Sequence, residues 1–325
     1  MNAILRTPIC DLLSVDIPIL SAGMAGGHAG PGLAAAVSNA GALGGLGGIV
    51  GGGPASTRLA IGETRALTAK PFSVNLWVHL VAAAPGFFDV CIEERVPSIT
   101  LSFGDPSPYV ARARDAGIIV ICQVQTVAGA RAAAAAGVDV IIAQGGEAGG
   151  HTGSVATMAL VPQVVDVAGG IPVIAGGGIA DGRGVVAALA LGAQGVVMGT
   201  RFVASLESTS PAAQHRERIV AASADDTVFT DVFDVVDGMR WPTGIHGRAI
   251  NTPFAQEWHG REDELRTSLD KIRAEADVPG QLPERAQSAY AGQSAGLISD
   301  VKPAAQIIRD IIAEAESVLA RLATD

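Results

Sequence analysis

A histidine inside a glycine-rich stretch is the clearest candidate for chemistry in this sequence. His151 lies in the segment 144–153, which reads QGGEAGGHTG. So many glycines exclude a packed helix, and we expect the imidazole to lie in an open loop where it can exchange a proton near neutral pH. Glu147, earlier in the same segment, could orient this ring or be solvated. The alternative for His151 is that it only caps a turn.

Two other glycine segments are typical of phosphate binding. Residues 176–178 (GGG) follow the apolar run 171–175, and residues 199–201 (GTR) follow the apolar run 195–198. Backbone amides at glycine approach phosphate oxygens without a Cβ atom in the way, and the threonine adds a hydroxyl donor. The glycines could instead only make tight turns, and the arginine could form a structural salt bridge.

Polar side chains at the ends of other apolar runs could bind a planar ring. Asn75, Ser102 and Gln144 stand within or directly after such runs. An amide donates and accepts hydrogen bonds at once, so it can pair with a heterocycle, although a buried amide usually serves backbone groups. The segment 30–35 (GPGLAA) matches a relaxed dinucleotide pattern but lacks the acid that such sites need about 20 residues later. Flavin mononucleotide (FMN), a planar cofactor with a phosphate tail, therefore fits better than a dinucleotide.

These residues need a scaffold that brings several strand ends together. Short apolar runs bounded by Gly or Pro alternate with Ala- and Leu-rich stretches, which is the pattern of a parallel α/β sheet. The predicted strands are 17–20, 42–46, 72–77, 98–101, 118–122, 138–143, 172–175 and 195–198. The predicted helices are 31–39, 56–68, 87–94, 108–116, 127–136, 159–167 and 184–191, with an eighth after Phe202.

Eight such units in about 200 residues predict an α/β fold of the (β/α)8 TIM-barrel type, with the active site in the loops after the strands. A doubly wound open sheet is the competing fold. We expect the barrel to span residues 1–205 and a mostly helical or irregular extension, 206–290, to cap the active site. Residues 291–325 are expected to contain an amphipathic helix, 303–322, that packs on the barrel.

Composition and charge exclude several classes of partner. The chain has 325 residues, of which 49% are hydrophobic and 17% charged, and its net charge is −10 without a basic stripe, so we expect no nucleic-acid partner. The three cysteines share no CxxC spacing and HExxH is absent, so no metal site is predicted. Neither a run of about 20 apolar residues nor a signal peptide is evident. We therefore expect a cytoplasmic protein with no membrane partner.

Five segments together resemble one family of enzymes. They are 18–24 (PILSAGM), 71–76 (PFSVNL), 147–151 (EAGGH), 172–179 (PVIAGGGI) and 198–202 (MGTRF), and the resemblance runs along nearly the whole chain. The family is that of the nitronate monooxygenases, formerly called 2-nitropropane dioxygenases. Its members are FMN-dependent barrels related to flavin-dependent enoyl-acyl-carrier-protein reductases. The segment 103–106 (FGDP) is intermediate between the patterns of the two groups, which leaves the substrate open.

The resemblance implies FMN as the cofactor and His151 as the catalytic residue. Together with the glycine segments, it gives the expected cofactor-binding residues as Ala22, Gly23, Met24, Asn75, Gln144, Gly149, Gly176, Gly177, Gly178, Gly199, Thr200, Arg201 and Phe202. Ser102 and His151 are expected to contact a small-molecule substrate.

The expected reaction is oxidation of an alkyl nitronate by FMN and O2 to a carbonyl compound and nitrite. The alternative is an NAD(P)H-dependent flavin reductase that acts on an enoyl thioester or a quinone. A cofactor-free scaffold is the third possibility. We also expect a homodimer.

Overall fold

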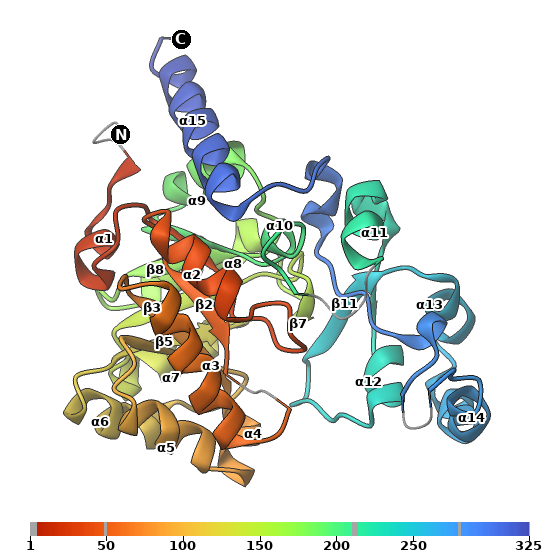
Figure 1. The fold of residues 1–325 in the computed structure, drawn as a ribbon. Coiled ribbons are helices and arrows are strands. Elements are labelled where there is room, and N and C mark those ends of the chain that lie inside the picture. The colour runs from red at the N-terminus through yellow and green to blue at the C-terminus, as the bar shows by residue number, and fades with distance from the viewer. Residues whose placement is uncertain (1–4, 49–50, 210–213, 279–280, 325) are drawn as a thin grey trace.

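The structure is a computed structural model that describes residues 5–48, 51–209, 214–278 and 281–324. Within these residues, eight parallel strands form a nearly closed barrel in the spatial order β1-β9-β8-β6-β5-β4-β3-β2 (Figure 1). The strands are β1 (Ile19–Ser21), β2 (Gly44–Gly47), β3 (Phe72–Trp77), β4 (Ser98–Ser102), β5 (Ile119–Val124), β6 (Val140–Gln144), β8 (Val173–Gly176) and β9 (Gly195–Met198). They coincide closely with the predicted strands, so the prediction of a TIM barrel is confirmed and the open sheet is excluded.

Helices follow the strands and cover the outside of the barrel (Figure 1). They are α2 (Pro31–Asn39), α3 (Pro54–Leu67), α4 (Val78–Ala83), α5 (Gly86–Glu93), α6 (Ser107–Asp115), α7 (Val127–Ala136), α8 (Thr157–Val167) and α9 (Gly182–Ala190). Side-chain caps fix some of their starts: Thr126 accepts from the amide of Gly129, and Asp181 accepts from the amide of Gly184. Two helices, α4 and α5, lie between β3 and β4, where the sequence predicts one.

Alternation along the strands divides the barrel core into two layers. In β6, Val140 and Ile142 pack inside the barrel with Ile9 of α1 (Pro8–Leu13). Ile141 and Ala143 belong to the outer layer, beneath the helices. A parallel strand buried on both faces has a continuous apolar sequence, which is why these strands can be predicted from short apolar runs.

The barrel closes between β1 and β2 through hydrogen bonds on either side of Leu43. The amide of Ser21 donates to the carbonyl of Leu43 at 3.0 Å, and the amide of Leu43 donates to the carbonyl of Ile19 at 3.0 Å. Glycine is required beside this seam, because a Cβ atom at Gly45 would overlap the carbonyl oxygen of Ser21. The uncharged, glycine-rich stretch after β1 therefore reflects close backbone packing. No helix in the described parts of the chain is long and apolar enough to cross a membrane.

The helix that completes the eighth unit differs from the prediction. Directly after β9 the chain forms only a short helix, α10 (Thr200–Val203). The helix that packs against α9 and α2 is α15 (Ala304–Leu322), which buries Ile307, Ile308 and Ile311 (Figure 1). The prediction was wrong here because the extension is inserted between the eighth strand and its helix, which breaks the regular alternation.

The extension has a core of its own and lies beside the barrel (Figure 1). It contains α11 (His215–Ala221), β10 (Thr227–Thr230), α12 (Val232–Asp237), β11 (His246–Ile250), α13 (Pro253–Trp258) and α14 (Glu262–Arg273). The two strands are not anticipated by the sequence pattern. They form an antiparallel sheet with β7 (Gly150–Thr152), which lies in the barrel loop after β6. This shared sheet joins the extension to the barrel at the segment that contains His151.

A pair of histidines, half-buried His28 and buried His215, also packs the extension on the barrel. His28, in the loop after β1, meets His215 of α11 edge to face, with ring centroids 5.0 Å apart. Burial lowers the pKa of each ring from 6.5 to about 4. Both rings are therefore neutral at pH 7 in the folded protein, whereas in the unfolded chain they take up protons as the pH falls below about 6.5.

We expect the free energy of unfolding to fall as the pH is lowered from 6.5 toward 4, because protons then bind preferentially to the unfolded chain. Each histidine contributes a loss of at most about 3 kcal/mol, and stability from this source is fully present above pH 6.5. Urea unfolding on either side of this window measures the effect. The variants His28→Gln and His215→Gln should flatten the pH dependence, and an unchanged slope in both would contradict this account.

Candidate active site

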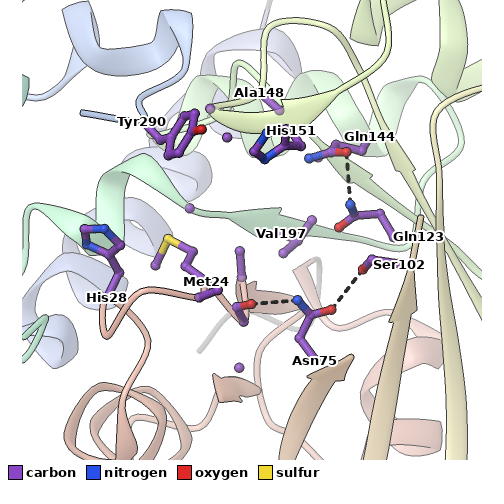
Figure 2. Close-up of a pocket in the computed structure, with 18 of the residues that line it drawn as sticks. Met24, His28, Asn75, Ser102, Gln123, Gln144, Ala148, His151, Val197 and Tyr290 are labelled. Carbon is purple, nitrogen blue, oxygen red and sulfur yellow. Dashed lines mark hydrogen bonds between the residues drawn. The ribbon is translucent and has the colours of Figure 1, made fainter. Parts of the chain in front are cut away.

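A cavity of about 320 Å³ lies at the carboxyl ends of the barrel strands, where barrel loops and the extension meet (Figure 2). Its volume is typical of a small-molecule site. The residues of the sequence-based prediction that line it are Ala22, Gly23, Met24, Asn75, Ser102, Gln144, Gly149, His151, Gly176, Gly177, Gly178, Gly199 and Thr200. The barrel thus brings together loops that are up to about 180 residues apart in the sequence, because parallel strands end at one rim.

Arg201 and Phe202, which were also expected to bind the cofactor, do not line this cavity. The Arg201 guanidinium is buried, donates to the backbone carbonyls of Asp300 at 2.8 Å and Ala204 at 3.1 Å, and forms an ion pair with the Asp300 carboxylate at 3.2 Å. Phe202 is fully buried in the barrel core. The side chain of Arg201 therefore has the structural role that the sequence left open, and the backbone amide of Phe202 donates to the carbonyl of Gly199 at 2.8 Å.

His151 lies in a strand instead of the open loop that the glycines suggest. His151 belongs to β7 and pairs with Gly247 of β11, so the extension supplies its partner strand. The imidazole stacks on Trp241, with ring centroids 3.6 Å apart and an angle of 17° between the rings. Its Nε2 atom lies 2.7 Å from Oδ1 of Asp234, and both side chains are only 9% exposed. The ring is thus held from two sides by the extension while it lines the cavity.

Three hydrogen-bonding groups converge on one oxygen of Asp234. Besides His151, the indole of Trp241 donates to Oδ1 at 3.0 Å and the hydroxyl of Tyr290 donates to it at 3.3 Å. Burial and the nearby carboxylates raise the pKa of Tyr290, which keeps this hydroxyl protonated. The sequence-based prediction missed all three partners of His151. A signal was present, since Asp234 is a charged residue in the middle of the apolar segment 232–236.

Glu147 does not contact His151. Its Oε2 atom accepts hydrogen bonds of 2.7 Å from both the amide and the hydroxyl of Thr157, at the start of α8. The carboxylate therefore fixes the beginning of that helix and the turn of the glycine-rich segment. It neither orients the histidine nor is simply solvated.

The glycine loops after β8 and β9 leave backbone exposed to the cavity. Gly178 has a φ of +72°, a conformation that side chains rarely adopt, and Gly199 has no atom nearer than 3.5 Å to the position that a Cβ would take. The hydroxyl of Thr200 accepts a hydrogen bond of 2.9 Å from the amide of Gly292, so its own proton is available for another partner. Two loops and a short helix at this place are the arrangement in which barrels recurrently bind phosphate.

The side-chain amides of Asn75 and Gln144 already form hydrogen bonds with neighbouring protein groups. Asn75 donates to the carbonyl of Gly23 at 2.7 Å and accepts from the hydroxyl of Ser102 at 2.9 Å (Figure 2), so it positions the loop after β1. The carbonyl oxygen of Gln144 accepts from Gln123 at 3.0 Å and from Gln125 at 2.9 Å, which leaves its amide nitrogen as the group available to a ligand.

Gln123 also lines the cavity and was not singled out in the sequence. It ends an ordinary apolar run, as Gln144 does, so the same signal was available. Among the described residues, no group of three or more His, Cys, Asp or Glu side chains could hold a metal ion.

Fold and site together define a TIM-barrel enzyme whose cavity is lined by glycines and by a nearly buried histidine. The family model described as nitronate monooxygenase matches residues 6–314. The chain belongs to the nitronate monooxygenase family, as its sequence motifs predict, and it is an oxidoreductase. Membership of this family implies that the cavity holds a flavin.

Relatives within this group differ in their described activities. A Mycobacterium tuberculosis protein named (3aS,4S,5R,7aS)-5-hydroxy-7a-methyl-1-oxo-octahydro-1H-indene-4-carboxyl-CoA dehydrogenase is 44% identical over 242 residues, which cover 72% of this chain and 65% of that protein. A probable nitronate monooxygenase of Staphylococcus aureus is 33% identical and covers 97% of this chain and 98% of its own. The structure of FabK from Thermotoga maritima aligns with a TM-score of 0.84 at 42% identity, over 98% of this chain and 99% of that one.

Proposed function

We propose that this protein is an FMN-dependent oxidoreductase in which His151 exchanges a proton with the substrate. The observation that carries the proposal is the position of His151, a nearly buried imidazole that lines the same cavity as two glycine loops. The histidine is held by Asp234 at 2.7 Å, which gives a proton-transfer group a fixed orientation.

The residues of the cavity fit FMN. Gly178, Gly199 and Thr200 would hold the phosphate through backbone amides and a hydroxyl. The amide nitrogen of Gln144 and the backbone of residues 22–24, positioned by Asn75, would contact the planar ring. When bound, FMN would supply the electron acceptor or donor for the reaction.

Oxidation of an alkyl nitronate with O2 to a carbonyl compound and nitrite is the first candidate reaction, because family membership and the S. aureus relative support it. In this reaction His151 would bind the anionic nitro group or take up a proton. The extension would exclude water, since Trp241 covers one face of the histidine ring and also contacts Trp77 and Phe103 of the barrel rim.

An NAD(P)H-dependent reaction on an enoyl thioester is the second candidate, and the charge of the cavity favours it. The described residues that line the cavity include the carboxylates of Asp234 and Asp237 but no lysine or arginine. Such a lining gives a preformed nitronate anion little stabilisation, whereas a neutral thioester is not repelled. The M. tuberculosis relative, named as a carboxyl-CoA dehydrogenase, supports a CoA thioester as the substrate.

Anaerobic mixing of the FMN-loaded protein with an alkyl nitronate tests the first candidate. We expect the visible flavin absorbance to bleach, and nitrite and a carbonyl compound to accumulate once O2 is admitted. If nitronate leaves the spectrum unchanged while NADH or NADPH bleaches it, and an enoyl thioester then restores the colour, the second candidate holds. A colourless protein that binds no added FMN would exclude both and favour a cofactor-free scaffold.

A further inference from the structure

The geometry points to Asp234 as a positioning residue that fixes the tautomer of His151, so that Nδ1 is the ring nitrogen that exchanges a proton with the substrate. This inference rests on the proposed role of His151 and adds to it the reacting atom and the residue that selects that atom. It follows from the hydrogen-bond donors around one carboxylate oxygen.

Oδ1 of Asp234 acts as an acceptor. The Trp241 indole nitrogen lies 3.0 Å from it and can only donate a hydrogen bond, because an indole N–H has no acceptor site. The Tyr290 hydroxyl donates to the same oxygen at 3.3 Å. An oxygen that already accepts these bonds does not carry a proton of its own, whatever the state of the other carboxylate oxygen.

The nearest contact of Oδ1 is Nε2 of His151, at 2.7 Å. Since Oδ1 accepts, Nε2 must donate, and the hydrogen of the neutral imidazole therefore lies on Nε2. In the imidazolium form Nε2 keeps this hydrogen and Nδ1 gains a second one. The two protonation states of the ring therefore differ only in the proton on Nδ1.

Nδ1 is free to serve the cavity. Within the described part of the chain, no hydrogen bond to Nδ1 is present, and His151 is part of the cavity lining. The ring cannot readily flip about its Cβ–Cγ bond, which would put carbon atoms in the places of both nitrogens, because it stacks on Trp241 at 3.6 Å and contacts Tyr290 at 5.1 Å between centroids. Figure 2 shows His151 and Tyr290 on the same side of the cavity, opposite Met24 and Asn75.

All the groups that select the tautomer come from beyond the barrel strands. Asp234 belongs to α12, Trp241 follows that helix, and Tyr290 stands near the return to the barrel, whereas His151 follows β6. The extension therefore does more than cover the cavity. It determines which nitrogen of the barrel's histidine is basic.

Nitrogen-15 NMR of the purified protein with labelled histidine measures the tautomer directly, without substrate. The His151 signals are assigned by their loss in His151→Gln. We expect the neutral His151 ring of the wild-type protein to show a protonated Nε2 and an unprotonated Nδ1. A neutral His151 with its proton on Nδ1 would overturn the inference even if the protein oxidises nitronates.

Two substitutions of Asp234 separate the effect of its acceptor oxygen from the effect of its negative charge. Asp234→Asn keeps a carbonyl oxygen available to all three donors, so the Nε2–H tautomer should persist while turnover falls by about tenfold, through loss of the charge that stabilises imidazolium. Asp234→Leu removes the acceptor, so the spectrum should show both tautomers and turnover should fall by about a hundredfold or more. If the leucine variant fails to fold, the wild-type spectrum still tests the tautomer and the turnover of Asp234→Asn still tests the role of the charge.

The chain provides a matched control for these substitutions. Asp231, three residues before Asp234, pairs with Nδ1 of His246 at the same distance of 2.7 Å. The side chains of Asp231 and His246 are each more than 40% exposed, and neither lines the cavity. Asp231→Asn should change neither the His151 spectrum nor turnover. An Asp234→Leu variant that keeps the wild-type His151 spectrum and full turnover would refute the positioning role, whichever substrate proves correct.

Discussion

Replacing His151 with alanine is expected to leave the flavin bound and to lower turnover by about a hundredfold or more, the scale of a lost acid or base. The imidazole contacts Asp234, Trp241 and Tyr290 of the extension, and none of these contacts involves the glycine loops after β8 and β9. Substrate chemistry should therefore suffer while cofactor binding does not. Flavin absorbance per mole of protein and steady-state turnover measure the two effects separately.

His246→Ala is the control for this substitution. Its side chain is 42% exposed and pairs with Asp231 outside the cavity, so the variant should keep both flavin and turnover. Unchanged turnover in His151→Ala would remove this histidine from the reaction. Loss of flavin in the same variant would instead place the imidazole against the cofactor.

The second large effect is expected at the phosphate end of the cavity, where Gly199→Val should weaken FMN binding more than tenfold, or by about 1.4 kcal/mol or more. The structure has room for the new Cβ, whose nearest neighbours would be Sδ of Met24 at 3.5 Å and Cβ of Ala22 at 3.7 Å. The protein should therefore fold, while the added methyl groups would fill the space that the phosphate requires. Flavin retained after gel filtration and the thermal unfolding temperature measure the two outcomes.

Gly199 is a better test position than Gly178, where a φ of +72° would strain any side chain and confuse loss of cofactor with loss of stability. Gly62→Val is a suitable control, since Gly62 lies on α3 outside the cavity with no atom within 4 Å of its Cβ position. It should retain FMN. A Gly199→Val variant with stoichiometric flavin would show that the phosphate lies elsewhere.

Local patterns explain what could be predicted from the sequence. The strands of the barrel are short apolar runs such as 138–143, and a parallel strand buried on both faces has no other sequence signature. Glycines that bound these runs also end helices: Gly137, just before the run 138–143, takes up the left-handed conformation after α7. The glycines of residues 176–178 indicated a loop, and this loop lines the cavity. Each of these signals is contained within a few residues, so no knowledge of the tertiary fold is needed.

The features that were missed depend on contacts between distant segments. Asp234 lies 83 residues from His151, and nothing in the local sequence pairs them. The residues of β7 have no strand pattern in the sequence. They form a strand because they pair with β11 of the extension. Arg201 was assigned to the cofactor because it follows a glycine loop, yet its partner is Asp300, 99 residues later. Such pairings appear only once the extension and the barrel are seen together.

The position of α15 has a consequence for how this chain is made. On the ribosome, the wall formed by α9 and α2 stays uncovered until residues 304–322 emerge, so the nascent barrel exposes the apolar surface that Ile307, Ile308 and Ile311 later cover. The extension, with its separate core around Phe233 and Phe254, has left the exit tunnel by then. The outer helical layer of the barrel is thus completed only after the extension has been made, and a translation pause before α15 would leave an aggregation-prone intermediate.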